Sequence, residues 1–239
     1  MPGVALAAAG RPWPYDPPID DLDPAPDTQP TGGRRLVEVV ALWTVGLVLL
    51  AGGIAAAIAA DVGVGPLDVV TTAINRRTGL DIGVAIVILN AAMVLVARII
   101  GGRVALSTLV TAAALGPAVD LWLRVIDHLL PDPSGVAAWA LLVAGVLLVG
   151  TGGGVQISSG WGPSPLDAMV VAIAGERWTL RLVRTIVEVS MAVGGALAGG
   201  ALGPGTVVVA LGVGPVLSQV VRLLAPLRRR LDVDLDADR

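Results

Sequence analysis

The sequence predicts an all-α membrane protein, a helix bundle of six transmembrane helices built as two inverted three-helix repeats, each with a short half-helix. Three observations predict this fold. Of the 239 residues, 55% are apolar and only 15% are charged, and the mean hydropathy is +0.82, whereas a soluble domain carries about 25% charged residues. The apolar residues also gather into long runs, and the two halves of the chain repeat one pattern of residues.

Residues 1–35 differ from the rest of the chain because they hold eight of its 17 prolines and five aspartates. Such a segment cannot bury enough apolar area to offset the entropy lost on ordering. We therefore expect a disordered cytoplasmic tail over 1–35, membrane repeat 1 over 36–130, membrane repeat 2 over 136–227 and a short charged C-terminal tail over 228–239.

Six apolar runs follow the tail, each close to the roughly 20 residues that cross a hydrocarbon core as a helix. They predict crossings at 36–60, 82–100, 104–123, 136–154, 182–200 and 206–224. An even number of crossings places both termini on the same side of the membrane.

Two shorter segments, 65–75 and 164–174, lie between the first and second runs and between the fourth and fifth. Each has a proline at its start and an aspartate two residues later, which is typical of a helix N-terminus. Each is too short to span a bilayer. We expect both to form half-helices that dip into the membrane or lie at its interface.

Arginine is distributed unevenly between the loops on the two sides of the predicted bundle. Eleven arginines fall on the side of the termini, whereas Arg76, Arg77 and Arg124 fall on the other side. Because short loops rich in Arg stay in the cytoplasm, we expect both termini to be cytoplasmic.

An internal repeat is the most informative feature. At an offset of 99 residues, Gly46, Gly53, Gly63 and the run Pro66-Leu67-Asp68 match Gly145, Gly152, Gly162 and Pro165-Leu166-Asp167. After a one-residue slip, an offset of 98 pairs Gly101-Gly102 with Gly199-Gly200 and Gly116-Pro117 with Gly214-Pro215. Each half has three crossings, an odd number, so two copies of the unit lie in the membrane in opposite orientations. Inverted repeats with broken helices are typical of secondary transporters.

Charged residues in the fifth run are the first candidates for a substrate-binding or ion-binding site. Arg184 and Glu188 are four residues apart and share a helix face, and Arg181 lies on nearly the same stripe. Glu188 lies roughly 10 Å along the axis from Arg181, at a depth where an unpaired charge costs several kcal/mol. Asn90 is the counterpart of Glu188 in the first half. An internal ion pair and an interhelical hydrogen bond explain these residues equally well.

The remaining candidates have structural explanations as well. Asp68 and Asp167 fall in the first turn of each half-helix, where a carboxylate caps free N–H groups, although the pair could also form a site. Gly116, Pro117, Gly214 and Pro215 lie inside the third and sixth runs, so both helices are expected to kink or unwind there as hinges or packing kinks.

The rare residue types exclude several kinds of chemistry. The chain has no Cys and one His, so it has no thiol nucleophile, no Cys/His zinc cluster and no motif with two His ligands. We expect no catalytic residue, no enzyme activity, no metal site and no cofactor. As partners we expect the lipid bilayer, an unknown small molecule or ion and, as a further candidate, a second copy of the chain, but no nucleic acid.

Several short motifs, taken in order, resemble one known family. They are Gly65-Pro66-Leu67-Asp68, Gly79-Leu80-Asp81-Ile82-Gly83, Gly101-Gly102-Arg103, Leu115-Gly116-Pro117, Arg184-Thr185-Ile186-Val187-Glu188 and Leu211-Gly212-Val213-Gly214-Pro215. Over roughly 38–226 the chain resembles the YczE-type bacterial integral membrane proteins of the YczE/YyaS/YitT grouping. The turn at Gly175-Glu176-Arg177 departs from the family's pattern.

The resemblance implies a multi-pass protein of the bacterial inner membrane, in a family without an established activity. Together with the repeat it favours a small-molecule or ion transporter that works by alternating access. The alternative is a non-transporting membrane scaffold or accessory factor that positions a partner protein.

Overall fold

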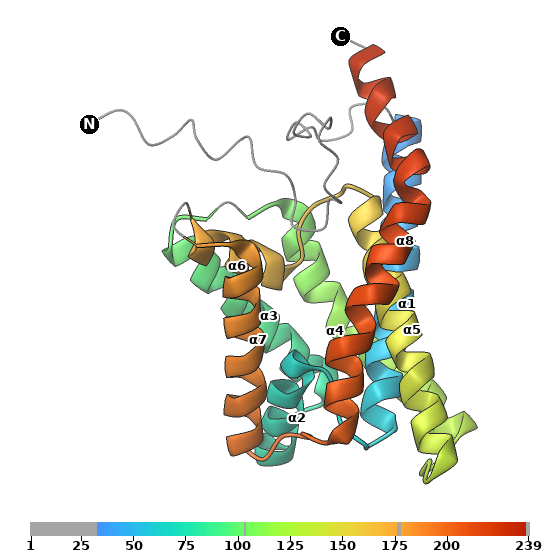
Figure 1. The fold of residues 1–239 in the computed structure, drawn as a ribbon, viewed down its shortest axis with the longest axis vertical. Coiled ribbons are helices and arrows are strands. Elements are labelled where there is room, and N and C mark those ends of the chain that lie inside the picture. The colour runs from blue at the N-terminus through green and yellow to red at the C-terminus, as the bar shows by residue number, and fades with distance from the viewer. Residues whose placement is uncertain (1–32, 103, 176–177, 238–239) are drawn as a thin grey trace.

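The computed structural model describes residues 33–102, 104–175 and 178–237, so the expected tail over 1–35 lies almost entirely outside the described residues. Within those ranges all of the regular structure is helical, in agreement with the all-α prediction. The helices are α1 (Gly33–Ala59), α2 (Pro66–Thr78), α3 (Ile82–Ile99), α4 (Leu106–Leu129), α5 (Val136–Ser158), α6 (Pro165–Ala174), α7 (Leu180–Leu197) and α8 (Pro204–Ala237) (Figure 1).

Five of the described helices, α1, α3, α4, α5 and α8, are long and apolar enough to cross a membrane. Helix α7 has 18 residues but carries three charged side chains, those of Arg181, Arg184 and Glu188. The described helices therefore agree with the predicted all-α bundle and include five candidate membrane spans.

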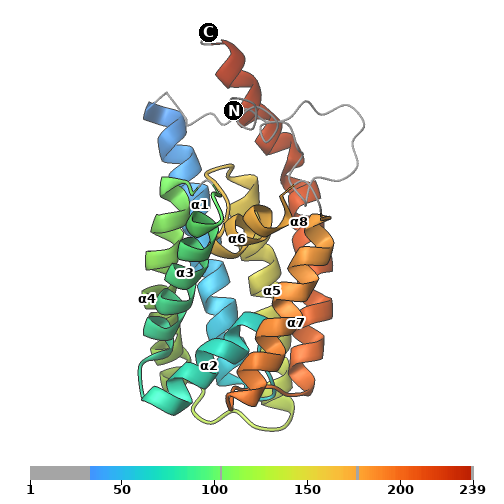
Figure 2. The same ribbon diagram turned by 90° about the vertical axis from the view of Figure 1, so that its left-hand side faces the viewer.

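The two predicted half-helices exist as α2 and α6, and both begin with proline at the first helical position. Helix α2 ends at Gly79, which has the left-handed backbone conformation that favours glycine. Figures 1 and 2 both show α6 near the end of the bundle from which α1 begins, with α2 towards the opposite end. The two short helices are thus separated along the bundle axis.

Helices α1 and α5 cross at glycines, which let their backbones approach closely. A Cβ atom placed on Gly46 would lie 2.9 Å from the carbonyl oxygen of Gly152, and one placed on Gly53 would lie 2.6 Å from that of Gly145. The earlier residue of α1 meets the later residue of α5, so the two helices run antiparallel. Because 145 and 152 are the repeat counterparts of 46 and 53, each helix presents the same two glycines to the other.

Packing between the helices largely follows the repeat. Helix α1 packs on α4 as α5 packs on α8, α2 packs on α7 as α6 packs on α3, and α2 packs on α3 as α6 packs on α7. Left-handed turns follow it as well, since φ is 125° at Gly63 and 139° at Gly162, and 89° at Gly101 and 87° at Gly199. Two counterpart pairs are missing among the described helices. Helix α3 packs on α4 but α7 does not pack on α8, and α4 packs on α6 but α8 does not pack on α2.

Helices α4 and α8 both extend further along the chain than their apolar runs. They also continue as helix through Pro117 and Pro215, so neither unwinds at its Gly-Pro pair, and a kink within the unbroken helix stays a prediction. Helix α4 reaches Leu129, six residues beyond the predicted end of the third run, because the weakly apolar turn around Asp127 still has helical hydrogen bonding. Helix α8 reaches Ala237, so the segment after 227 continues the last crossing as helix.

Candidate functional site

An ionic network joins α6 to α7. The Arg184 guanidinium donates from Nη1 to Asp167 Oδ1 at 2.8 Å and from Nε to Glu188 Oε1 at 2.8 Å. Asp167 is almost completely buried, whereas the side chains of Arg184 and Glu188 are 30% and 31% exposed. The sequence predicted the pair of Arg184 and Glu188 but did not predict that Asp167 joins it.

The N-terminal turn of α6 holds Asp167 in place. The Ser164 hydroxyl accepts the backbone N–H of Asp167 at 3.2 Å and donates to Asp167 Oδ2 at 2.6 Å. Ser164 is therefore the N-cap of α6, which corrects the expectation that Asp167 caps the helix. The Asp167 carboxylate is left to bind Arg184, because the serine already satisfies the free N–H group.

Asp68, the counterpart of Asp167, has a different environment. Position 86, the counterpart of Arg184, is isoleucine, and Ile86 is buried in an apolar cluster with Val119 of α4. No ion pair of Asp68 occurs among the described residues, and its helix has no side-chain cap. Burial raises the pKa of Asp68 to about 7. Each half-helix thus carries an aspartate in its first turn, but only the second has a cation beside it.

Two other predicted site residues stand outside the network. Asn90 is buried on α3, and its Nδ2 has no hydrogen-bond partner among the residues that the structure describes. Its neighbours Leu89 and Met93 pack in the same apolar cluster as Val187 of α7, but no described hydrogen bond joins Asn90 to Glu188. Arg181 is exposed and has no ion pair among the described residues.

The contact between α3 and α4 is closed by small residues and one carboxylate. Gly83 and Gly116 face each other so closely that a Cβ on either would collide with the backbone oxygen of the other. Asp120 Oδ1 accepts the backbone N–H of Gly83 at 2.7 Å, which satisfies one of the free donors at the start of α3. Asp120 lies three residues after Pro117, and no local signal in the sequence identifies Gly83 as its partner.

The counterpart residues of α7 and α8 cannot form the same contact. Arg181 stands where the first half has Gly83, and Ser218 stands where it has Asp120. A Cβ on Gly214, the counterpart of Gly116, would have no neighbour within 4 Å. The hinge residues of the two halves therefore differ in environment, since Gly116 is packed and Gly214 is exposed.

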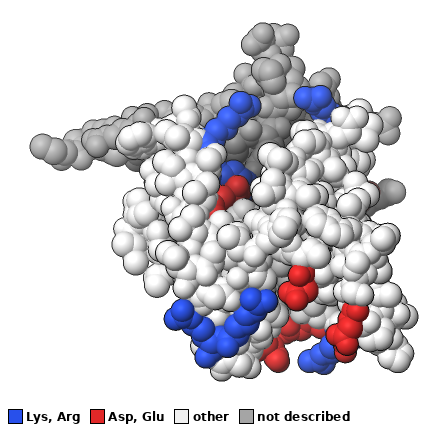
Figure 3. Space-filling view, turned by 60° about the horizontal axis from the view of Figure 1, so that its bottom comes forward, with Lys and Arg blue, Asp and Glu red and all other residues white. Residues whose placement is uncertain are grey.

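An open groove lies between α7 and α8, and we call it the α7/α8 groove. Helical spacing puts each of two sets on one stripe of its helix, and we take these two stripes as the walls of the groove: Arg181, Thr185, Glu188 and Ala192 on α7, and Val207, Leu211, Gly214, Ser218 and Arg222 on α8. Each of these residues is exposed or half-buried, and none is fully buried. Figure 3 shows acidic and basic side chains recessed in a hollow between two apolar lobes of the surface.

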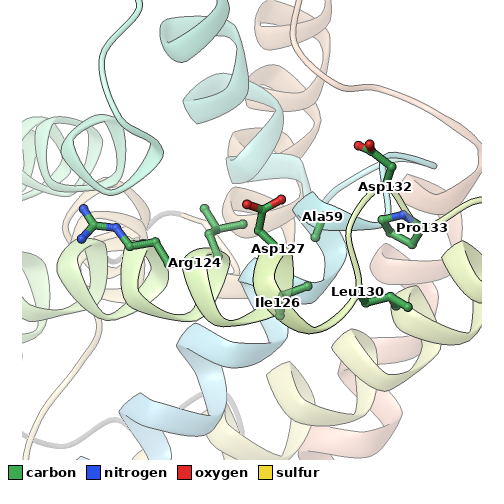
Figure 4. Close-up of a pocket in the computed structure, with 8 residues that line it drawn as sticks. Ala59, Arg124, Ile126, Asp127, Leu130, Asp132 and Pro133 are labelled. Carbon is green, nitrogen blue, oxygen red and sulfur yellow. The ribbon is translucent and has the colours of Figure 1, made fainter.

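A separate cavity of about 350 Å³ lies at the far end of α4 and was not predicted from the sequence. It is lined in part by Arg124, Asp127 and Asp132 (Figure 4). Asp132 has a positive φ of 46° in the turn between α4 and α5. Among the described residues no group of three or more carboxylate or histidine side chains could hold a metal ion. In the sequence, this turn is indicated by Asp127 and by the two prolines Pro131 and Pro133.

Comparisons with known proteins agree with the resemblance seen in the sequence. A model described as a family of unknown function, DUF6198, matches residues 37–222. The uncharacterized membrane protein YczE of Bacillus subtilis is 26% identical over 75% of this chain and 85% of its own length. The uncharacterized protein YyaS of the same organism is 25% identical over 69% of this chain and 83% of its own length.

A further relative is an uncharacterized protein of Haemophilus influenzae, which is 27% identical over 68% of this chain and 73% of its own length. No solved structure matches this chain. The matches extend over the membrane helices of both halves, so they concern the bundle as a whole.

Proposed function

This chain belongs to the DUF6198 family of unknown function, within the YczE-type grouping of membrane proteins, and from that premise we propose that it is a transporter. It moves a small molecule or ion across the bacterial cell membrane by alternating access, with α7 as a sixth crossing and both termini in the cytoplasm. The network of Asp167, Arg184 and Glu188 forms the centre of its site, with Asn90 on the opposite repeat. The proposal assigns no catalytic reaction to the chain.

The inverted repeat is supported by the crossing of α1 and α5. Their antiparallel contact pairs Gly46 with Gly152 and Gly53 with Gly145, so each helix uses the same surface towards the other. Contacts of this kind arise when two units are related by a two-fold axis. The three matched pairs of helix contacts support the same relation.

The crossing by α7 is supported by its length and by the direction of its charges. Its 18 residues extend about 27 Å, close to the thickness of a hydrocarbon core. Arg184 pairs with both Glu188 and Asp167. Paired charges that face the inside of a bundle are the usual way in which a membrane helix carries ionisable residues.

The observation that carries the proposal is the position of this network on the wall of the α7/α8 groove. Glu188 lies eight residues from the start of α7, about 12 Å along its axis and near mid-depth. If α7 closed onto α8 as α3 closes onto α4, the network would lose its remaining contact with water. Burying charge that is incompletely paired costs several kcal/mol, so a substrate that neutralises the network would make closure favourable.

Asp68 supplies a site for proton coupling. Its raised pKa of about 7 means that it binds and releases a proton near neutral pH. It lies on the half-helix of the first repeat, and among the described residues no arginine forms an ion pair with it. Protonation of Asp68 would favour one of the two arrangements of the repeats, and neutralisation of Glu188 would favour the other.

Distance measurements between spin labels test alternating access without knowledge of the substrate. The chain has no Cys, so labels attach only at introduced cysteines. One pair, Thr185→Cys with Leu211→Cys, spans the α7/α8 groove, and its repeat counterpart, Val87→Cys with Ala113→Cys, spans α3 and α4. In lipid vesicles we expect two populations for each pair, with the long distance in one pair accompanied by the short distance in the other.

Lowering the pH from 8 to 5 should lengthen the distance in one pair and shorten it in the other. Glu188→Gln should also shift the two pairs in opposite directions. A single distance that is the same in all conditions for both pairs would contradict alternating access. It would favour the alternative function, a membrane scaffold or accessory factor that positions a partner protein. Such a scaffold would need an exterior patch for its partner, whereas Gly150, Gly154 and Gly195 pack inside the described bundle.

A further inference from the structure

The two walls of the α7/α8 groove change character along its length. At the end from which α7 starts, the walls carry Arg181 and Thr185 on α7 and Ser218 and Arg222 on α8. At the other end they carry Ala192, Val207 and Leu211, and the side chains of Val207 and Leu211 are 60% and 71% exposed. The groove is therefore polar at one end and apolar at the other.

Arg181 and Arg222 lie at about the same height on the two walls. The short segment 198–203 joins the end of α7 to the start of α8, so both heights can be measured from that segment. Arg181 is 16 residues from Leu197, about 24 Å, and Arg222 is 18 residues from Pro204, about 27 Å. Figure 3 shows basic side chains at the rim of the hollow, beyond the recessed charges.

Neither arginine has an ion pair among the described residues, whereas Arg184 is held by Asp167 and Glu188. Arg181 also stands at the position whose counterpart, Gly83, closes the contact between α3 and α4. Two guanidinium groups across one opening repel each other unless an anion lies between them. An occupant that suits both ends of the groove thus has an anionic group and an apolar chain.

We propose that the α7/α8 groove binds an anionic phospholipid, with its phosphate between Arg181 and Arg222 and an acyl chain along Leu211 and Val207. Guanidinium groups recognise phosphate oxygens through two parallel hydrogen bonds. No described helix packs against both α7 and α8 across the groove, so in this proposal its open side faces the bilayer. This site goes beyond the proposed function and does not require transport.

Lipid retention by the full-length protein tests the site. The purified protein is mixed in detergent with dioleoyl phosphatidylglycerol or dioleoyl phosphatidylcholine, and bound lipid is counted by native mass spectrometry. We expect retention of phosphatidylglycerol over phosphatidylcholine, and a loss of about tenfold or more in phosphatidylglycerol affinity in the Arg181→Gln/Arg222→Gln variant, because two charged hydrogen-bonding groups are removed. Glycerol phosphate, which has the anion without the chains, should not compete.

Two further variants separate the site from general charge and from misfolding. Arg98→Gln/Arg124→Gln removes the same charge from exposed positions outside the groove and should retain the lipid. Gly214→Leu adds a side chain to the groove at a position where a Cβ atom has no protein atom within 4 Å, so it should weaken lipid binding while the melting temperature stays unchanged.

Equal loss in both arginine pairs, or unchanged binding in Arg181→Gln/Arg222→Gln and Gly214→Leu, would overturn the proposal. Competition by glycerol phosphate would also overturn it, because the site would then recognise a free phosphate. Retention of lipid by a protein that shows no alternating distances would leave this site standing while the transport function fails.

Discussion

Arg184 is the residue on which the candidate site depends, because it holds two carboxylates that would otherwise repel each other. Asp167 is buried behind it, and Glu188 is half-buried beside it on the same helix. An unpaired buried carboxylate is costly, so the arginine acts on stability as well as on charge. The effect of each group on the other can be measured directly.

The substitution Arg184→Gln should destabilise the protein by about 1–3 kcal/mol, less than for a fully buried pair because Arg184 is partly exposed. Arg184→Gln combined with Asp167→Asn should recover part of this loss, because the neutral amide no longer needs a cation. Denaturant titration in mixed micelles gives the free energies of unfolding for this double-mutant cycle. Strict additivity of the two changes would show that the 2.8 Å contact contributes nothing.

The raised pKa of Asp68 makes stability depend on pH. The folded protein binds a proton up to a pH of about 7, whereas an unfolded aspartate loses it near its ordinary value of 3.8. Stability from this group is therefore fully present below the ordinary value and is lost as the pH rises through about 7. Between pH 5 and pH 8 the melting temperature should fall, by about 2–4 °C for each kcal/mol lost.

The variant Asp68→Asn should abolish this part of the pH dependence and should be more stable than the parent protein at pH 8. Intrinsic tryptophan fluorescence during heating in detergent reports the transition. Asp81→Asn, a change at an exposed aspartate, is the control and should keep the slope of the parent. An Asp68→Asn profile that runs parallel to that of the parent would mean that Asp68 stays ionised in the folded protein.

At the scale of helices, the largest difference between the two halves is the contact of α3 with α4. Helices α3 and α4 meet through Gly83, Gly116 and Asp120, while their counterparts α7 and α8 remain apart. The difference arises from two positions, where arginine replaces glycine on α7 and serine replaces aspartate on α8. A pair of helices that crosses at glycine needs the backbone surface of both partners, so one large residue is enough to prevent it.

The same substitution at two counterpart positions tests this explanation. Gly116→Ala should destabilise the protein by about 1–3 kcal/mol, because the added methyl group collides with the backbone of α3. Gly214→Ala should be neutral or stabilising by up to about 1 kcal/mol, because alanine favours helix and meets no atom there. Melting temperatures of the two variants in one detergent provide the comparison, and equal values would contradict it.

At the scale of the whole molecule, the number of crossings decides where the termini lie. Five described helices have the length and composition of a membrane span, and α7 is the sixth in the proposed arrangement. With α7 across the bilayer the termini share one side, and without it they lie on opposite sides. The excess of arginine on the side of the termini favours the cytoplasm.

Fusions of a fluorescent protein and of alkaline phosphatase to the C-terminus test the number of crossings. The fluorescent fusion should be bright and the phosphatase fusion inactive, because fluorescence develops in the cytoplasm and the phosphatase folds outside it. A cysteine introduced near the N-terminus should be protected from an impermeant thiol reagent in intact cells. Labelling of that cysteine together with a bright C-terminal fusion would mean an odd number of crossings.

Much of this molecule can be predicted from its sequence, because the helices of a membrane protein are marked by the composition of short stretches of chain. Long apolar runs fix which segments form long helices, and the Pro-Leu-Asp motifs mark the starts of both short ones, so the helix order is confirmed from α1 to α8. The pairing of Arg184 with Glu188 was predictable for the same reason, since four residues on one helix always share a face. Contacts between segments that are distant in the chain have no such local signal.

The sequence by itself determined which segments form helices and where the charged residues stand, because both depend on residues that are close in the chain, and it predicted the repeat from a match between its halves. The tertiary structure alone decided that Asp167 turns from its own helix to Arg184, that Asp120 binds Gly83, and that α7 stands away from α8. The reason is physical. A carboxylate takes whichever donor the fold brings within about 3 Å, and two helices close only where both present small surfaces, so these outcomes depend on how separate helices meet.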